Sequence, residues 1–260
     1  MKKILNVIII HFYLELKIMF RYLVSSLSDL LLYAGTFVII LFFSNTEQLN
    51  LFYHTNKGVF MVLIGYLFWG GGTAAMDTVS QCIENDAKTG ILEMEIQSIV
   101  PLWGINIIRN IINNIYIWIY LTIIGIALCV ISNLSLKSLL YLLFITLIIS
   151  TVSNLGMFGI GLLFGAGSVR FKYMGQWSML FQAVLLVGSN ITYPVQSNFQ
   201  LILPYVGGIE ITRKLFLNQN INVSSFGYYL LINVCWLFIG ILVFNLTMAY
   251  EKKKGSFEVY

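Results

Sequence analysis

Few residues in this chain could carry out chemistry. It contains two histidines, His11 and His54, and three single cysteines, Cys82, Cys129 and Cys235. None of them has the close spacing that a metal site or a disulfide framework needs. The chain also lacks a glycine-rich phosphate loop, and it has no nucleophile with a base near it. We therefore expect no catalytic site, no metal site, no bound cofactor and no ATP hydrolysis by this chain alone.

A mainly acidic group of charged residues follows the second long apolar segment. Residues 83–93 read Ile-Glu-Asn-Asp-Ala-Lys-Thr-Gly-Ile-Leu-Glu, and a short amphipathic stretch leads from there to Pro101. Gly90 favours a tight turn, and a proline suits the start of a new helix. The pattern predicts a compact segment over 83–100 that contains a short helix at the membrane surface.

Two apolar segments carry small and polar residues at helical spacing. The first stripe consists of Tyr66, Gly70, Thr73, Asp77 and Ser80, and the second of Ser178, Gln182, Ser189 and Tyr193. An acid that faces lipid costs roughly 2.5–3.5 kcal/mol at mid-membrane, so the face with Asp77 should point at protein or water. Both stripes are candidates for a translocation path, and helix packing through small and polar residues explains them equally well.

The composition indicates which elements must position these residues. Of the 260 residues, 58% are hydrophobic and 10% charged, and the mean hydropathy is +0.85. Soluble domains contain roughly 45–50% apolar residues, which excludes a water-soluble globule. The basic residues lie at the ends of apolar segments rather than along one groove, which argues against a nucleic-acid partner. We expect a multi-pass all-α membrane protein with a single transmembrane domain over 1–260.

Six apolar segments approach the length of about 20 residues that crosses a bilayer. They cover 27–44, 58–81, 106–131, 136–166, 173–193 and 226–250. The segment 4–24 differs, because its Leu, Ile and Phe residues share one stripe and its charged residues lie outside it. This pattern predicts an amphipathic interfacial helix in contact with membrane lipid. A spanning helix there is the alternative, but it would bury four ionisable groups in lipid.

The distribution of basic residues predicts the orientation in the plasma membrane. An even number of spans places both termini on one side, and a cytoplasmic N-terminus puts eleven basic residues inside against four outside. Both termini should therefore be cytoplasmic. The long outer connection 194–224 is semi-apolar and contains Pro194, Pro204 and two adjacent glycines. We expect it to form short helices that dip into the outer leaflet.

The segment 83–100 resembles the coupling loop of the permease subunits of type-2 ABC transporters, which are ATP-binding-cassette exporters. In that family the loop between the second and third membrane helices reads Glu, then Gly-Thr-Leu-Glu, and later Ser/Thr-Pro. The matching residues are Glu84, Gly90, Leu92, Glu93 and Pro101. Two positions depart from the pattern, since Ile91 replaces the usual Thr and Val100 precedes the proline.

A second segment supports the same resemblance. Residues 204–213 are similar to the re-entrant external helices before the last span of that family, through Pro204, Glu210 and Arg213. With the interfacial helix and six spans, the resemblance covers nearly the whole chain. It implies a permease subunit that works with two copies of a separate ATPase, which holds ATP and magnesium. It also implies a second permease copy, in a homodimer or in a heterodimer with a related chain.

The cargo is open at this stage. Uncharged helices rich in Tyr, Trp and Phe suit an amphipathic or hydrophobic cargo such as a drug, a peptide or a lipid. The family also contains exporters of lipid-linked polysaccharide and teichoic acid, which is the alternative. Two other classes compete with the exporter. A secondary transporter would need an ion-coupling cluster in the membrane, where Asp77 is nearly alone, and a non-transporting membrane scaffold would need no cytoplasmic lever.

Overall fold

The computed structural model describes residues 23–98, 100–131, 135–171 and 174–254, together with isolated residues before position 23. All regular elements in these ranges are helical, and no strand occurs in them. The elements are α2 (Leu23–Phe43), α3 (Thr46–Tyr53), α4 (Gly58–Lys88), α5 (Ile91–Ile96), α6 (Leu102–Ile131), α7 (Leu136–Phe171), α8 (Gly175–Gly188), the 3-10 helix η1 (Asn198–Ile202), α9 (Val206–Phe216) and α10 (Val223–Lys254). The predicted all-α class is confirmed for this part of the chain.

The interfacial helix predicted for 4–24 falls mostly outside the described residues. The isolated residues that are described before position 23 are helical and exposed, among them Ile10, Tyr13 and Lys17. The amphipathic course of this segment stays a prediction.

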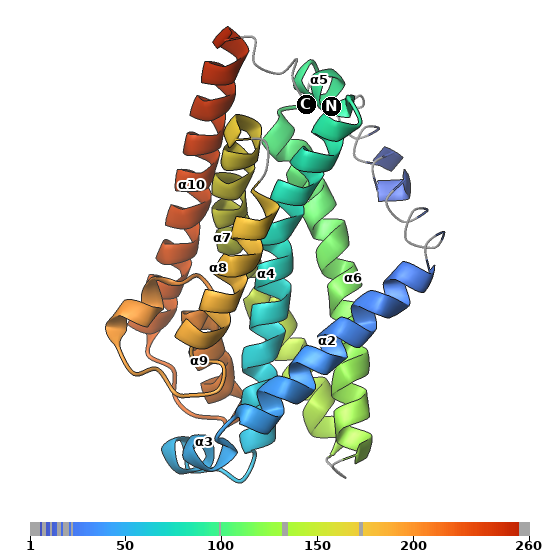
Figure 1. Cartoon of the computed structure of the whole chain (residues 1–260). Helices are drawn as coiled ribbons and strands as arrows, with labels where there is room; N and C mark the ends of the chain where they lie inside the picture. Colours follow the sequence, from blue (N-terminus) through green and yellow to red (C-terminus); the bar gives the residue numbers. More distant parts are fainter. Residues whose placement is uncertain are drawn as a thin grey trace.

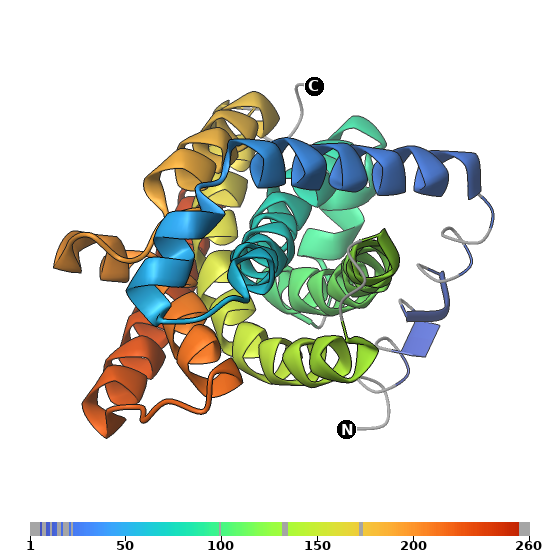
Figure 2. The same ribbon diagram turned by 90° about the horizontal axis from the view of Figure 1, so that it is seen from below.

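Helix α4 forms the centre of the bundle. Figure 2 shows it surrounded by α2, α6, α7 and α8, and it contacts all four of them. Its apolar side chains are buried all round, including Ile64, Leu67 and Phe68. Figure 1 shows α5 and the C-terminal end of α10 at one end of the bundle, with α3 and α9 at the other. We call these the α5 end and the α9 end.

Helix α10 is attached to the bundle mainly through α7. The two backbones touch where Gly159 and Gly240 face each other. A Cβ atom on Gly240 would lie 2.1 Å from the carbonyl oxygen of Gly159, and one on Gly159 would lie 2.3 Å from that of Trp236. This close approach is the kind of packing that small residues allow between membrane helices.

Four described helices are long and apolar enough to cross a membrane, namely α4, α6, α7 and α10. A fifth candidate span pairs Leu27–Phe43 of α2 with α3, across a bend of 70°. Helix α8 has 14 residues and is about 21 Å long, whereas the hydrocarbon core is roughly 30 Å thick. The described part of the chain thus contains four or five helices of spanning length. The six-span topology stays a prediction.

The outer faces of the long helices are apolar. Exposed Ile111, Ile115 and Ile119 follow one side of α6, and exposed Val234 and Phe238 do the same on α10. A soluble monomer rarely exposes contiguous apolar surface of this extent. Together with the spanning helices, these faces identify a membrane-embedded protein.

Candidate functional site

The predicted coupling segment begins inside α4 and not after it. The second span was expected to end at residue 81, but the helix continues to Lys88, because a charged sequence without Pro or Gly does not interrupt it. Gly90 then adopts φ 73°, a left-handed conformation that favours glycine, and α5 follows at once. The carbonyl of Pro101 accepts the first hydrogen bonds of α6, from Gly104 at 2.8 Å and Ile105 at 3.2 Å.

A buried charge cluster fixes α5 to the two long helices beside it. The Arg109 guanidinium on α6 donates to Asp86 on α4 at 2.5 Å and to Glu95 on α5 at 2.7 Å. All three side chains are nearly buried. Burial and the neighbouring Asp86 carboxylate raise the pKa of Glu95 and Arg109 lowers it, and the net result is a pKa of about 7. The cluster therefore joins three helices through one cation.

Glu84 lies inside the protein and connects α4 to α8. Its Oε1 accepts hydrogen bonds from the backbone N–H groups of Met174 and Gly175, both at 2.7 Å, and from the Ser168 hydroxyl at 3.3 Å. These N–H groups belong to the start of α8, where a carboxylate is also favoured by the helix dipole. Glu84 thus caps α8 and is not available to a partner protein.

The other matched residues divide between the core and the surface. Leu92 is buried in a cluster with Val79 and Ile83 of α4, whereas Glu93 and Met94 are exposed. The exposed side of α5 is thus apolar with one acid. Sequence reasoning did not select Arg109 or its two partners, although a single Arg at the start of an apolar segment near several acids was a usable signal.

A polar cavity of about 440 Å³ lies among α2, α4, α6 and α8. Three residues predicted for a translocation path line it, namely Thr73, Asp77 and Gln182. Ser178 is adjacent, because its hydroxyl donates to the Asp77 carboxylate, which also accepts from the Gln81 amide. The structure thus brings four of the seven predicted path residues together.

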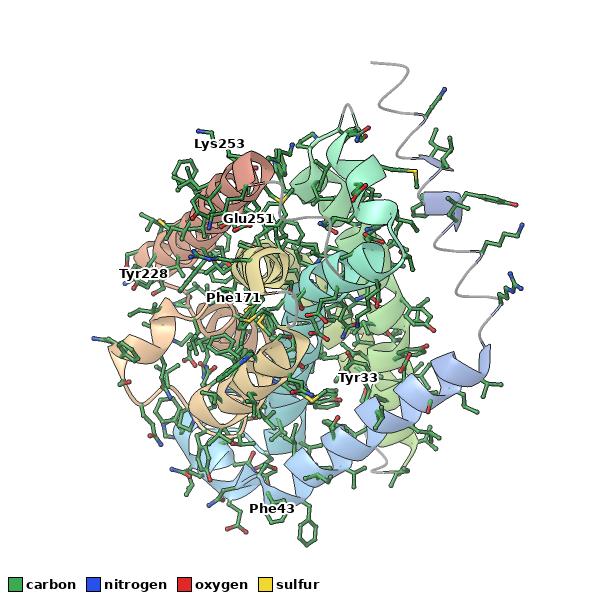
Figure 3. All side chains as sticks on the ribbon, turned by 45° about the horizontal axis from the view of Figure 1, so that its top comes forward. Tyr33, Phe43, Phe171, Tyr228, Glu251 and Lys253 are labelled. Carbon is green, nitrogen blue, oxygen red and sulfur yellow. The ribbon has the colours of Figure 1, made fainter. Side chains whose placement is uncertain are left out.

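Other cavity residues come from α2 and α6, in which the sequence indicated no residues of a translocation path. Asp29, Tyr33 and Thr36 of α2 contribute one wall, and Asn113 and Tyr116 of α6 contribute another. Figure 3 shows Tyr33 on the side of α2 that faces the rest of the bundle. Only the packing of α2 and α6 against α4 reveals this group, because no spacing within one segment connects them.

The remaining three residues predicted for the path lie outside the lining of this cavity. Tyr66 is fully buried, donates to the Tyr33 carbonyl at 2.6 Å and lies 2.8 Å from the Thr36 hydroxyl, so it holds α2 against α4. The expectation that Ser189 and Tyr193 continue the stripe of the fifth span was wrong. Helix α8 ends at Gly188 and the chain becomes extended at Ser189, so helical periodicity no longer applies to them.

At the α9 end, the segment 194–224 forms η1 and α9, in agreement with the short helices that we expected. Arg213 of α9 is fully buried and donates to the carbonyls of Met61 at 3.0 Å, Ile191 at 2.7 Å and Tyr193 at 3.4 Å. The carbonyl of Pro204 accepts from Asn233 at 3.0 Å. This segment is thus fastened to α4, to the chain after α8 and to α10.

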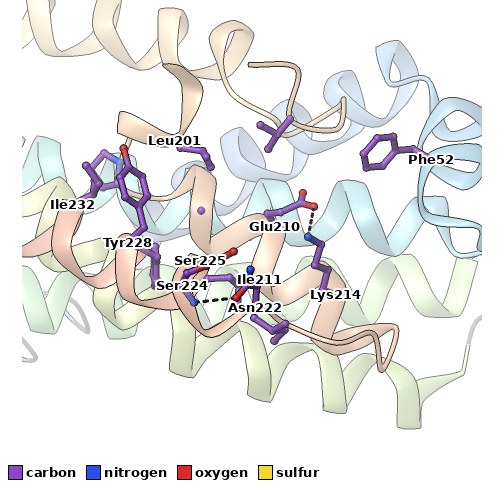
Figure 4. A pocket seen from close by; sticks show the side chains of 15 residues that line it. Phe52, Leu201, Glu210, Ile211, Lys214, Asn222, Ser224, Ser225, Tyr228 and Ile232 are labelled. Carbon is purple, nitrogen blue, oxygen red and sulfur yellow. Dashed lines mark hydrogen bonds and ion pairs between the residues drawn. The ribbon is translucent and has the colours of Figure 1, made fainter. Parts of the chain in front are cut away.

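A second cavity, of about 520 Å³, lies between α9 and α10 (Figure 4). Glu210 and Lys214 lie on its wall, 3.5 Å apart, so that the two charges compensate each other. Glu210 also accepts a hydrogen bond from the Tyr53 hydroxyl at 2.5 Å, and the same hydroxyl lies 3.5 Å from Arg213.

The described residues contain no group of His, Cys, Asp or Glu side chains that could hold a metal ion. What the geometry defines is a membrane-embedded helical protein with a polar cavity and a short anchored helix at one end. A search against protein-family models finds no match for this chain, and a search of curated proteins finds none.

Proposed function

We propose that this chain is the membrane-spanning permease subunit of an ATP-driven exporter of the type-2 ABC class. In this proposal two copies of the chain, or one copy and a related permease, work with two copies of a separate nucleotide-binding protein. That partner binds ATP and magnesium and carries out hydrolysis, so this chain is not an enzyme by itself. The α5 end is the cytoplasmic end, and the complex lies in the plasma membrane.

The continuity of α4 is the observation that best supports this proposal. Asp77 on α4 lines the cavity, and Asp86, about 14 Å further along the same helix, binds the cluster that fixes α5. Glu84 ties this part of α4 to the start of α8, which forms another wall of the cavity. A displacement of α5 would therefore be passed directly to two walls of the cavity.

The surface of α5 suggests how the ATPase would be engaged. Three of the acids in segment 83–100 are occupied inside the protein, namely Glu84, Asp86 and Glu95. The exposed side offers Ile91, Glu93 and Met94 instead. We therefore expect the partner to receive α5 in an apolar groove with a basic or donor group opposite Glu93.

The cavity favours an amphipathic or hydrophobic cargo. Its lining combines aromatic rings with amide and hydroxyl groups, which is typical of sites for small amphipathic molecules. A lipid-linked polysaccharide or teichoic acid is the second candidate cargo. The cavity supports it less, because the lining includes no Lys or Arg that could pair with phosphate groups.

A photo-crosslinking amino acid in place of Met94 tests the proposal. Met94 is 68% exposed on α5, and Phe199, 79% exposed at the α9 end, provides the matched control position. We expect the Met94 position to capture a protein that contains a phosphate-binding loop, and the Phe199 position not to capture it. The absence of such a protein at Met94, or ATP turnover by the purified chain without a partner, would contradict the proposal.

A further inference from the structure

The polar cavity among α2, α4, α6 and α8 has an unbalanced charge. Two carboxylates, Asp29 and Asp77, line it, and none of the described residues in its lining is Lys or Arg. The cavity between α9 and α10 differs in this respect, because its carboxylate, Glu210, has Lys214 at 3.5 Å. One cavity thus has a basic side chain beside its acid, whereas the lining of the other contains two acids and no basic side chain.

The acids of this cavity are placed for binding rather than for packing alone. The Asp77 carboxylate lines the cavity and accepts hydrogen bonds from Ser178 and Gln81. Asp29 is partly exposed on α2, opposite α4. A ligand between the two helices would meet a carboxylate on each side.

Three aromatic side chains complete the lining. Tyr33, Trp69 and Tyr116 come from three different helices, and the Trp69 indole is oriented by its hydrogen bond to the Gln182 carbonyl at 3.3 Å. The faces of Tyr and Trp rings attract cations, and organic ammonium groups are often bound by such rings together with acids. Rings of this size also bury the apolar part of a ligand.

We propose that this cavity binds organic cations with apolar substituents, such as lipophilic amines, quaternary ions or short cationic amphipathic peptides. The binding of these cations is independent of the proposed function. The statement that they are the exported cargo rests on the proposed function. The volume of about 440 Å³ is within the range of small-molecule sites. The carboxylates supply the charge, and the aromatic rings receive the substituents.

Two ions of nearly identical shape and opposite charge test the proposal. Tetraphenylphosphonium is a cation, tetraphenylborate is an anion, and both carry four phenyl groups. Equilibrium dialysis of each ion against the detergent-solubilised full chain measures binding without ATP and without a partner protein. We expect saturable binding of the cation and at least about tenfold weaker binding of the anion. Equal binding of both ions, or binding of neither, would overturn the proposal.

Variants locate the site. Asp77→Asn and Asp29→Asn should each weaken binding of the cation about tenfold and leave the weak binding of the anion unchanged. Glu47→Gln removes an exposed acid on α3, far from the cavity lining, and should change neither. The Asp29 variant makes the test independent of any loss of folding in the Asp77 variant. Unchanged cation affinity in both would overturn the proposal, while the crosslinking result at Met94 would still decide the exporter assignment.

Discussion

Two arginines are held inside the protein at opposite ends of the bundle, and their partners differ. Arg109 binds two carboxylates on neighbouring helices, whereas the described partners of Arg213 are mainly backbone carbonyls. Buried carboxylates and buried carbonyls both lose stability when their donor is removed. The two ends of the bundle are therefore held in different ways, by side-chain charges at the α5 end and by backbone carbonyls at the α9 end.

The largest expected effect is that of Arg213→Met. This change leaves the Ile191 carbonyl without the Arg213 donor and removes both hydrogen bonds from Arg213 to the Met61 carbonyl, so the free energy of unfolding should fall by about 3–5 kcal/mol. Thermal unfolding in detergent measures it. Lys214→Met, on the next residue, removes only a partly exposed pair and should cost at most about 1 kcal/mol. Equal melting temperatures for the two variants would contradict the role given to Arg213.

A smaller loss of stability, about 3 kcal/mol, is expected for Arg109→Met. Two buried carboxylates would then face each other without a cation. Adding Asp86→Asn and Glu95→Gln to the same chain removes both charges and should recover most of the loss. The comparison of the single and triple variants in the same unfolding assay tests this. A triple variant as unstable as the single one would show that the charges are not the cause.

A substitution at Gly90 should perturb the α5 end less than the loss of Arg109 does. Gly90 has a left-handed backbone, in which a residue with a side chain is less stable by about 1–2 kcal/mol. The space around Gly90 is open, so an added Cβ atom would meet no other atoms. Gly90→Val should therefore lower stability slightly and alter the direction of α5. Gly90→Asn is the control, because Asn tolerates this conformation. The melting temperature of the Val variant should lie below that of the Asn variant, and the reverse order would argue against the turn.

A further effect is a dependence on pH. The pKa of Glu95 rises from its ordinary 4.5 to about 7 in the folded protein, chiefly through burial. A raised folded-state pKa favours the protonated acid, so this contribution to stability is present below about pH 4.5 and is lost as the pH rises through 7. Melting temperatures of the natural chain should therefore fall relative to Glu95→Gln between pH 5 and pH 8. A difference that is constant or of opposite sign would contradict this.

Much of the fold could be predicted from apolar segments alone. The segments 58–81, 106–131, 136–166 and 226–250 correspond to α4, α6, α7 and α10, because about 20 apolar residues between charged ends leave few alternatives. Helix ends were less predictable. The continuation of α4 to Lys88 and the early end of α8 at Gly188 depend on what surrounds them, which composition does not record.

The candidate site was predictable only where it lies within one helix. Thr73 and Asp77 share a face of α4, and their spacing identified them. The contribution of Asp29 depends on how α2 packs, and the partners of Arg109 depend on three helices that meet. Such contacts between distant parts of the chain leave no periodic signal in a single sequence. Glu84 had a matching motif, but its place as the cap of α8 was not foreseeable from it.

The central claim is that α5 transmits the work of an ATPase to the cavity. The most direct measurement is ATP turnover in vesicles that contain this chain together with its ATPase partner. It compares the natural chain with the Glu93→Lys and Glu47→Lys variants. Both glutamates are exposed, so neither change should lower the free energy of unfolding by more than about 0.5 kcal/mol. The yield of the protein should therefore be nearly the same for all three chains. We predict that Glu93→Lys abolishes turnover and transport while Glu47→Lys retains both. Equal turnover in all three chains would contradict the account.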